Sequence, residues 1–137
     1  MMDNEKQTLS AVRLEKAEEN LAAARSLISS GSYRIATTRT YYAIFHAMRA
    51  VLALDGIDRK HHSAIIAEFR RLYIRTGLIS KNQSETISKL SDLRSDSDYD
   101  DFFIVSKEEA IEALDEAEAF VSEIRNYLIE RTGKNIS

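Results

Sequence analysis

The densest group of residues able to do chemistry is the run RTYYAIFH at positions 39–46. On a helix, seven residues return to within about 20° of the starting direction, so Arg39 and His46 share one face, about 10 Å apart along the axis. An arginine that holds phosphate beside a histidine that moves a proton would meet the needs of RNA cleavage without a metal. The alternative is structural: Tyr42, Phe45 and Met48 would form a core stripe, and His46 would be a partly buried imidazole with a satisfied ring nitrogen.

A second group is the run RSDSDY at positions 94–99. Arg94 and Asp98 are four residues apart and would form an ion pair on one face if the helix continues that far. In the functional interpretation both are catalytic residues, Arg94 binds an anion, and Tyr99 offers a hydroxyl that contacts or accepts a nucleotide. The alternative is a plain surface ion pair, worth less than about 1 kcal/mol.

A third group, Arg59, Lys60, His61 and His62, lies at the predicted start of a helix. These side chains and the free N–H groups of the first helical turn would bind phosphate or RNA, and the alternative is a solvated basic turn. Adjacent side chains diverge on a helix and no third ligand is suitably spaced, so we expect no metal here. The glycines form neither a phosphate-binding loop nor a dinucleotide fingerprint, so we expect no kinase, no dehydrogenase and no cofactor.

The elements that position these residues are all predicted to be helices. The chain has no proline and four glycines, and each glycine follows a stretch with helical spacing, where a left-handed C-terminal cap is usual. Two capping boxes, Ser80 with Gln83 and Ser106 with Glu109, indicate the starts of the last two helices. The first three predicted helices cover about residues 8–29, 32–54 and 61–75. The fourth begins near residue 80 and fades within residues 96–101, and the fifth covers about residues 107–131.

Apolar residues at three- and four-residue spacing define the buried face of each predicted helix. We expect an antiparallel, up-and-down, all-α bundle of about five helices. The predicted core residues are Leu14, Ala17, Leu21, Ala24 and Ile28; Ile35, Tyr42, Phe45, Met48 and Leu52; Ile65, Ile66, Phe69, Leu72 and Tyr73; and Ile111, Leu114, Ala117, Val121, Ile124 and Leu128.

Composition favours one globular domain over residues 1–137, with a core over about 8–130. The chain is 44% hydrophobic and 30% charged, and it has no cysteine, which excludes disulfides and thiolate chemistry. The net charge is -3, with bases concentrated in 59–81 and acids in 92–123, which predicts a basic and an acidic pole. No apolar run approaches the roughly 20 residues that cross a membrane, and the N-terminus is polar, so we expect a cytoplasmic protein that binds no membrane.

Three segments resemble the HEPN family, in particular its small bacterial and archaeal branch: ATTRTYYAIFHA at 36–47, HS at 62–63 and LRSDSDY at 93–99. The resemblance extends over roughly residues 8–130. It implies an antiparallel helical bundle that forms a homodimer and is often encoded beside a minimal nucleotidyltransferase, as a toxin with its antitoxin. It also implies that active members are metal-independent RNases.

The family motif is an arginine followed, after four to six residues, by a histidine near the start of a late helix. Arg94 matches the arginine, but Asp98 and Tyr99 stand where the histidine is expected. An ordinary aspartate, with a pKa near 3.9, is a weak base at neutral pH. His46 or His62 would have to supply the base, if the bundle folds either one toward Arg94. In some family pairs the partner attaches AMP to a tyrosine next to the motif, and Tyr99 matches it by location.

Two functional hypotheses follow. The first is a toxin-like HEPN protein that cleaves or binds RNA as a homodimer. The second is a non-catalytic module that binds a nucleotide or partners a nucleotidyltransferase, which the missing late-helix histidine favours. Its docking surface would be the acidic stretch near residue 98 and the acidic last helix.

Overall fold

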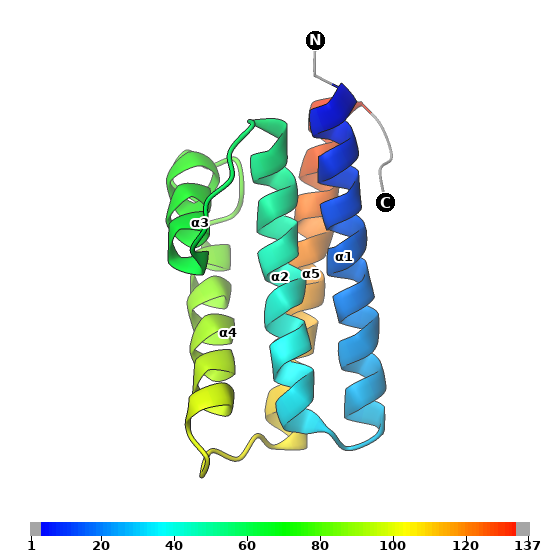
Figure 1. Cartoon of the computed structure of the whole chain (residues 1–137), viewed down its shortest axis with the longest axis vertical. Coiled ribbons are helices and arrows are strands. Elements are labelled where there is room, and N and C mark those ends of the chain that lie inside the picture. The colour runs from blue at the N-terminus through cyan, green and yellow to red at the C-terminus, as the bar shows by residue number, and fades with distance from the viewer. Residues whose placement is uncertain (1–3, 134–137) are drawn as a thin grey trace.

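The computed structural model describes residues 4–133; Met1 to Asp3 of the polar N-terminus and residues 134–137 lie outside the described part of the predicted domain. Within it, the chain forms an all-α, antiparallel, up-and-down bundle, which confirms the predicted fold class (Figure 1). The helices are α1 (Asn4–Ser29), α2 (Tyr33–Leu54), α3 (His62–Phe69), which continues as a π-helical turn η1 (Arg70–Ile74), α4 (Asn82–Tyr99) and α5 (Lys107–Thr132).

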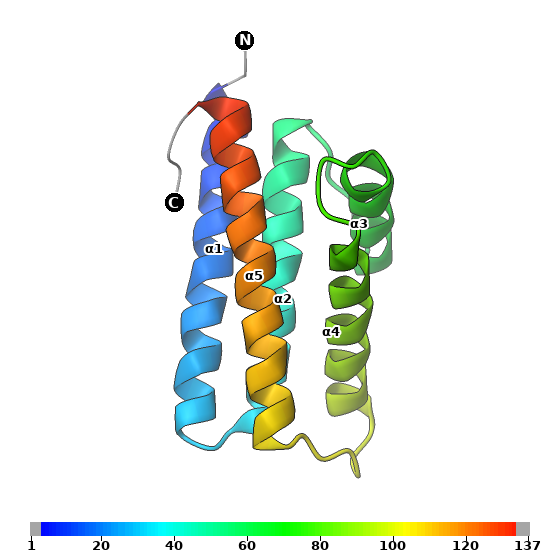
Figure 2. The same ribbon diagram turned by 180° about the vertical axis from the view of Figure 1, so that it is seen from behind.

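The helix α2 lies at the centre of the bundle. The helices α1 and α5 pack on one side of it, and α3, stacked above α4, lies on the other (Figures 1 and 2). Fourteen of its 22 residues are buried, including alanines at 36, 43, 47 and 50 that let neighbouring helices approach closely. Because α2 contacts α1, α3, α4 and α5, side chains on its different faces reach different neighbouring helices.

The predicted core stripes are largely buried, with two errors. Leu14, Phe45 and Phe69 belong to the core as predicted. Ile35 and Ile111 were predicted to be buried, but they are 56% and 39% exposed. Each lies in the first or second turn of its helix, so the apolar stripe extends to the lower end of the bundle, where no further helix covers it.

The helix ends follow local sequence where no tertiary contact competes. Ser106 and Glu109 form the predicted capping box, and all four glycines have positive φ, with Gly133 capping α5 in the left-handed conformation. The other predicted box is wrong. Ser80 and Gln83 instead both donate hydrogen bonds to the Glu123 carboxylate on α5, and α4 begins at Asn82 without a side-chain cap.

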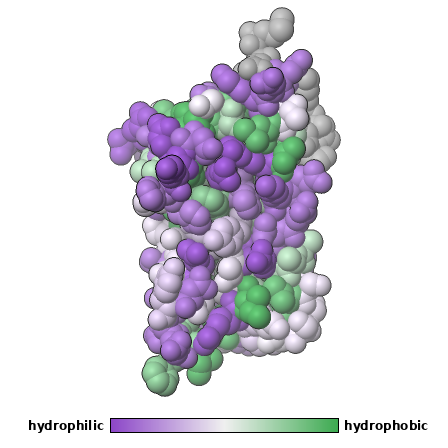
Figure 3. Space-filling view, viewed as in Figure 1, coloured by the Kyte–Doolittle hydropathy of each residue, from purple (hydrophilic) through white to green (hydrophobic). Residues whose placement is uncertain are grey.

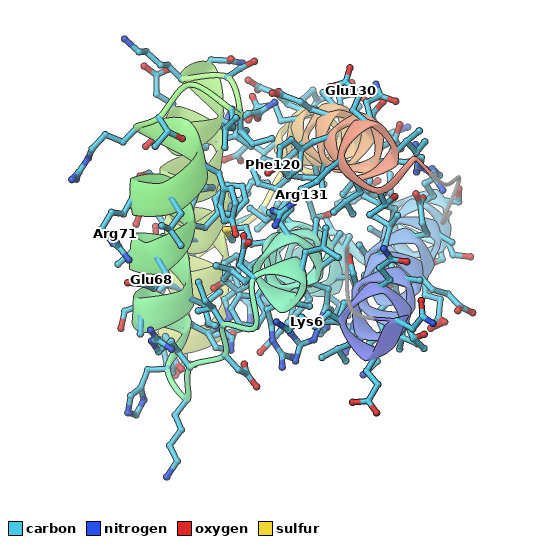
Figure 4. All side chains as sticks on the ribbon, turned by 90° about the horizontal axis from the view of Figure 1, so that it is seen from above. Lys6, Glu68, Arg71, Phe120, Glu130 and Arg131 are labelled. Atoms are coloured by element: carbon cyan, nitrogen blue, oxygen red, sulfur yellow. The ribbon has the colours of Figure 1, made fainter. Side chains whose placement is uncertain are left out.

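The predicted third helix changes its hydrogen bonding part-way along. Its second half, η1, is a π-helix, where the backbone N–H of Arg75 donates to the carbonyl of Arg70. Tyr73 of this turn donates its hydroxyl to Asp55 at the end of α2, and Asp55 also pairs with Arg131 of α5. Figure 4, seen from above, shows Arg131 and the core residue Phe120 pointing from α5 toward the middle of the bundle.

The connection from α4 to α5, residues 100–106, crosses the lower end of the bundle with few contacts. Phe102 is 91% exposed and Ile104 is 83% exposed. Hydrophobic side chains are visible at this end in Figure 3, while hydrophilic ones cover most of the surface over α3. The Arg34 side chain donates to the carbonyl of Phe103 at 2.8 Å and so ties the connection to α2. Among residues 4–133, no helix has the length and apolar character needed to cross a membrane.

Candidate functional site

The Arg94 guanidinium lies between α4 and α2. Its Nε is 2.9 Å from Asp98 Oδ2, which is the predicted ion pair, and it forms because α4 continues to Tyr99. Its Nη2 donates to the Tyr42 hydroxyl at 3.3 Å, and Cζ lies 5.2 Å from the centre of the Tyr41 ring. Among the described residues Nη1 has no hydrogen-bond partner. Arg94 is thus held by an acid and two aromatic rings, with donors left for an anion.

His62, the first residue of α3, contacts the same pair of tyrosines. Its Nδ1 is 3.1 Å from the Tyr41 hydroxyl, and its ring stacks on Phe45 with the ring centres 3.9 Å apart. Burial lowers the pKa of His62, and the positive charges of Arg94 and Arg49 lower it further. At neutral pH the imidazole is therefore neutral and able to accept a proton.

The tyrosines join Arg94 to His62. The Tyr41 ring contacts Arg94, and its hydroxyl contacts His62. The Tyr42 ring centre lies 5.7 Å from that of His62 and 5.5 Å from the Arg94 Cζ. Burial raises the pKa of Tyr41, so its hydroxyl keeps its proton at neutral pH. Of the two histidines proposed to serve Arg94, His62 is the one connected to it through a direct hydrogen bond to a shared neighbour.

His46 lies one turn further along α2. Its ring is 6.1 Å from that of Tyr42 and 5.9 Å from that of Phe45. Burial lowers the pKa of His46 to about 4, with further contributions from Arg49, Lys16, Arg13 and His62. Its buried Nδ1 has no hydrogen-bond partner among residues 4–133. The burial of His46 agrees with its structural interpretation, whereas the unpaired Nδ1 differs from the satisfied ring nitrogen that this interpretation expects.

Arg39 does not join this cluster. Its guanidinium is exposed and donates to Asn20 on α1 at 3.4 Å. It shares a face of α2 with His46, as the helical spacing requires, but no described contact links the two side chains. The matching spacing of Arg39 and His46 therefore does not make them a pair.

The predicted basic stretch borders a shallow hollow of about 430 Å³ beside His62. Arg59 and Lys60 line it, together with Phe45, Arg49 and Asp58. His61 and His62 point apart, as predicted for neighbours on a helix: His61 is exposed and His62 is half-buried. The sequence did not indicate Arg49, although it lies four residues after Phe45 and so on the same face of α2.

Tyr99 ends α4 and is 78% exposed, with its hydroxyl free of the Arg94 cluster in the described contacts. Asp98, next to it, also accepts a hydrogen bond from Thr38 at 3.3 Å. No set of three or more histidine, aspartate or glutamate side chains within residues 4–133 is arranged to hold a metal ion.

The chain is similar to proteins of archaea over most of its length. It is 38% identical to "Putative toxin MJ0605" and 32% identical to "Putative toxin MJ0142", both of Methanocaldococcus jannaschii. These matches cover 85% and 86% of this chain and 87% and 80% of those proteins. It is 36% identical to a "UPF0332 protein" of Archaeoglobus fulgidus, over 84% of this chain and 91% of that protein. The HEPN domain family matches residues 10–127, so the chain belongs to the HEPN family.

Proposed function

We propose that this protein is a toxin-like HEPN protein that binds RNA and cleaves it without a metal ion. The observation that carries the proposal is the cluster in which Tyr41 and Tyr42 hold Arg94 and His62 together. Relatives named as toxins support the toxin-like part. The missing late-helix histidine is replaced, in this proposal, by His62 from another helix.

In the proposed reaction His62 is the base and Arg94 the anion-binding group. When His62 donates Nδ1–H to the Tyr41 oxygen, the lone pair lies on Nε2, which accepts the proton of the ribose 2′-hydroxyl. The 2′-oxygen bonds to phosphorus, the bond from phosphorus to the 5′-oxygen breaks, and that oxygen takes a proton from solvent. Arg94 neutralises the charge that develops on the phosphate. Asp98 orients Arg94 through their ion pair, so we assign it a positioning role.

The basic hollow beside His62 would hold the strand on either side of the cleaved bond. Arg59 and Lys60 carry positive charge for phosphates, and the half-buried His62 ring, which stacks on the buried Phe45, is the aromatic group beside them. We also propose, from the family resemblance, that the protein is a cytoplasmic homodimer; light scattering of the purified protein measures the mass directly.

The test is cleavage of a pool of labelled single-stranded RNAs in EDTA. Arg94→Ala and His62→Ala should each lower the rate by about 10²-fold or more, since each removes a group used in the transition state. Arg75→Ala, which removes an exposed arginine outside the cluster, is the matched control and should retain the wild-type rate. Wild-type rates in both Arg94→Ala and His62→Ala would reject this site.

A second function is favoured by the contacts of Arg94 and the exposure of Tyr99. The Asp98 carboxylate already neutralises the positive charge of Arg94, and Tyr99 is largely exposed to solvent. These features suit a non-catalytic module whose Tyr99 accepts AMP from a nucleotidyltransferase partner. Incubation with that partner and ATP should then add one AMP, located by mass spectrometry. Tyr99→Phe should abolish the modification, whereas Tyr33→Phe should not.

A further inference from the structure

Asp58 stands among an excess of positive charge between α1, α2 and the loop before α3. The guanidinium of Arg13 lies 3.6 Å from its Oδ2, and that of Arg49 lies 3.5 Å from its Oδ1. Arg59 and Lys60 line the hollow beside it, and Glu68 lies 3.7 Å from Arg59. On the other side, Lys6 and Glu5 border a second hollow together with Arg13 and Asp58. The single carboxylate of Asp58 therefore contacts two guanidinium groups, and two further cations, Arg59 and Lys60, lie nearby.

Arg13 is the buried member of this cluster, whereas Asp58 is largely exposed. The Arg13 side chain is 10% exposed, and its Nη1 donates to the backbone carbonyl of Arg49 at 3.2 Å. The Asp58 side chain is 62% exposed, and its contacts with the two guanidinium groups are longer than a good charge-assisted hydrogen bond of about 2.8 Å. Bringing two cations together is costly, and burial followed by the charge of Arg49 lowers the pKa of Arg13. A phosphodiester carries the same single negative charge as the Asp58 carboxylate, but it is not tied to this loop and could approach both guanidinium groups to about 2.8 Å.

An aromatic pair, the half-buried His62 stacked on the buried Phe45, adjoins this cluster. The stacked rings of Phe45 and His62 line the same hollow as Asp58 and Arg49, and the Arg49 Cζ is 6.0 Å from the centre of the Phe45 ring. A positively charged groove next to an aromatic face is the combination that binds single-stranded nucleic acid, phosphate on the cations and base on the ring. The volume of about 430 Å³ suits one nucleotide.

We propose that Asp58 is a built-in competitor that occupies a phosphate site formed by Arg13 and Arg49, and that a phosphate of a single-stranded RNA displaces it. The inference rests on the proposed function, because it takes RNA as the ligand. The proposal adds a second phosphate site, next to His62 and separate from Arg94. In this site Asp58 competes with RNA and weakens its binding.

The sharpest test is Asp58→Asn. An asparagine keeps the Oδ1 acceptor that receives the backbone N–H of Arg59 at 3.0 Å, so the loop retains its hydrogen bond while the competing charge is removed. The probe is a labelled 2′-O-methyl oligonucleotide, which binds like RNA and is not cleaved because its 2′-oxygen carries no proton. Asp58→Asn should bind it about three- to tenfold more tightly at 0.1 M salt. Asp92→Asn makes the same charge change on the exposed surface of α4 and is the matched control.

Arg49→Ala supplies the opposite test and should weaken binding about tenfold or more, whereas Arg75→Ala should change it little. Melting temperatures of all four variants establish that they fold. Equal affinities of Asp58→Asn and Asp92→Asn, with wild-type binding intact, would overturn the competitor while leaving the RNA function in place. Tighter binding by Asp58→Asn with no cleavage by wild type would uphold the competitor and reject catalysis. Failure of wild type and Asp58→Asn to bind would reject the phosphate site.

Discussion

His46 provides a quantitative test of the cationic environment around α2. Its imidazole is half-buried among Tyr42 and Phe45, and its buried Nδ1 has no hydrogen-bond partner among residues 4–133. Phenylalanine has a similar flat ring without titratable nitrogens. His46→Phe therefore removes the titration at this position and breaks no described hydrogen bond of Nδ1.

The direction of the effect follows from where the proton binds. The pKa of His46 is about 4 in the folded protein and 6.5 when unperturbed, so between these values the unfolded chain binds the proton and the folded chain does not. Stability from this group is present above pH 6.5 and is lost as the pH falls toward 4. The loss amounts to about 2 kcal/mol at pH 5 and about 3 kcal/mol at pH 4.

Urea denaturation from pH 7 to 4.5 measures this loss. The free energy of unfolding of the wild type should fall more steeply than that of His46→Phe, with a difference of about 2 kcal/mol between pH 7 and pH 5. His61→Gln, which removes an exposed imidazole, should follow the wild-type curve. His62, whose pKa is also lowered, leaves some slope in His46→Phe. Parallel curves for wild type and His46→Phe would refute the reasoning.

Three further predictions concern the bundle and the site. Ser106→Ala removes the capping box at the start of α5 and should lower the free energy of unfolding by about 1 kcal/mol in urea denaturation; no change would mean that the first turn of α5 is held by packing alone. Phe120→Ala empties a fully buried position and should cost about 3–5 kcal/mol in the same assay, whereas a loss below 1 kcal/mol would show that the core closes around the gap. Since burial lowers the pKa of His62 below 6.5, the rate of RNA cleavage should rise with pH, pass its half-maximum below pH 6.5 and then level off, and a rate still rising above pH 8 would point to another base.

The sequence predicts the helices well because their signals are local. Apolar spacing and the four glycines define where most helices lie and end, and the capping box at Ser106 depends only on residues three apart. The prediction at Ser80 is wrong because Glu123, 43 residues away, offers a carboxylate that competes for the same side chain. Ile35 and Ile111 show the converse: spacing predicts a face, but not where the partner helix stops.

The site could be predicted only in part, for the same physical reason. The ion pair of Arg94 with Asp98 is a one-turn interaction within α4, and the sequence predicts it. The approach of His62 depends on how α3 packs against α2, and so on contacts between residues 21 positions apart. The sequence therefore left either His46 or His62 to supply the base, with His46 predicted as catalytic and His62 as RNA-binding. Tyr41, Arg13 and Arg49 went unrecognised, because each has an ordinary structural interpretation until its neighbours are known.

The sparse connection across the lower end of the bundle has a consequence for the covalent chain. The helix α5 packs directly against α1 and α2, whereas within residues 100–106 Val105 is buried and Phe102 is largely exposed. A protease that cleaves after Phe102 would therefore yield two fragments, one carrying α1 to α4 and the other α5, that stay associated through the core. Side-chain packing between the helices holds the bundle together at this end, and the backbone of residues 100–106 only connects α4 to α5.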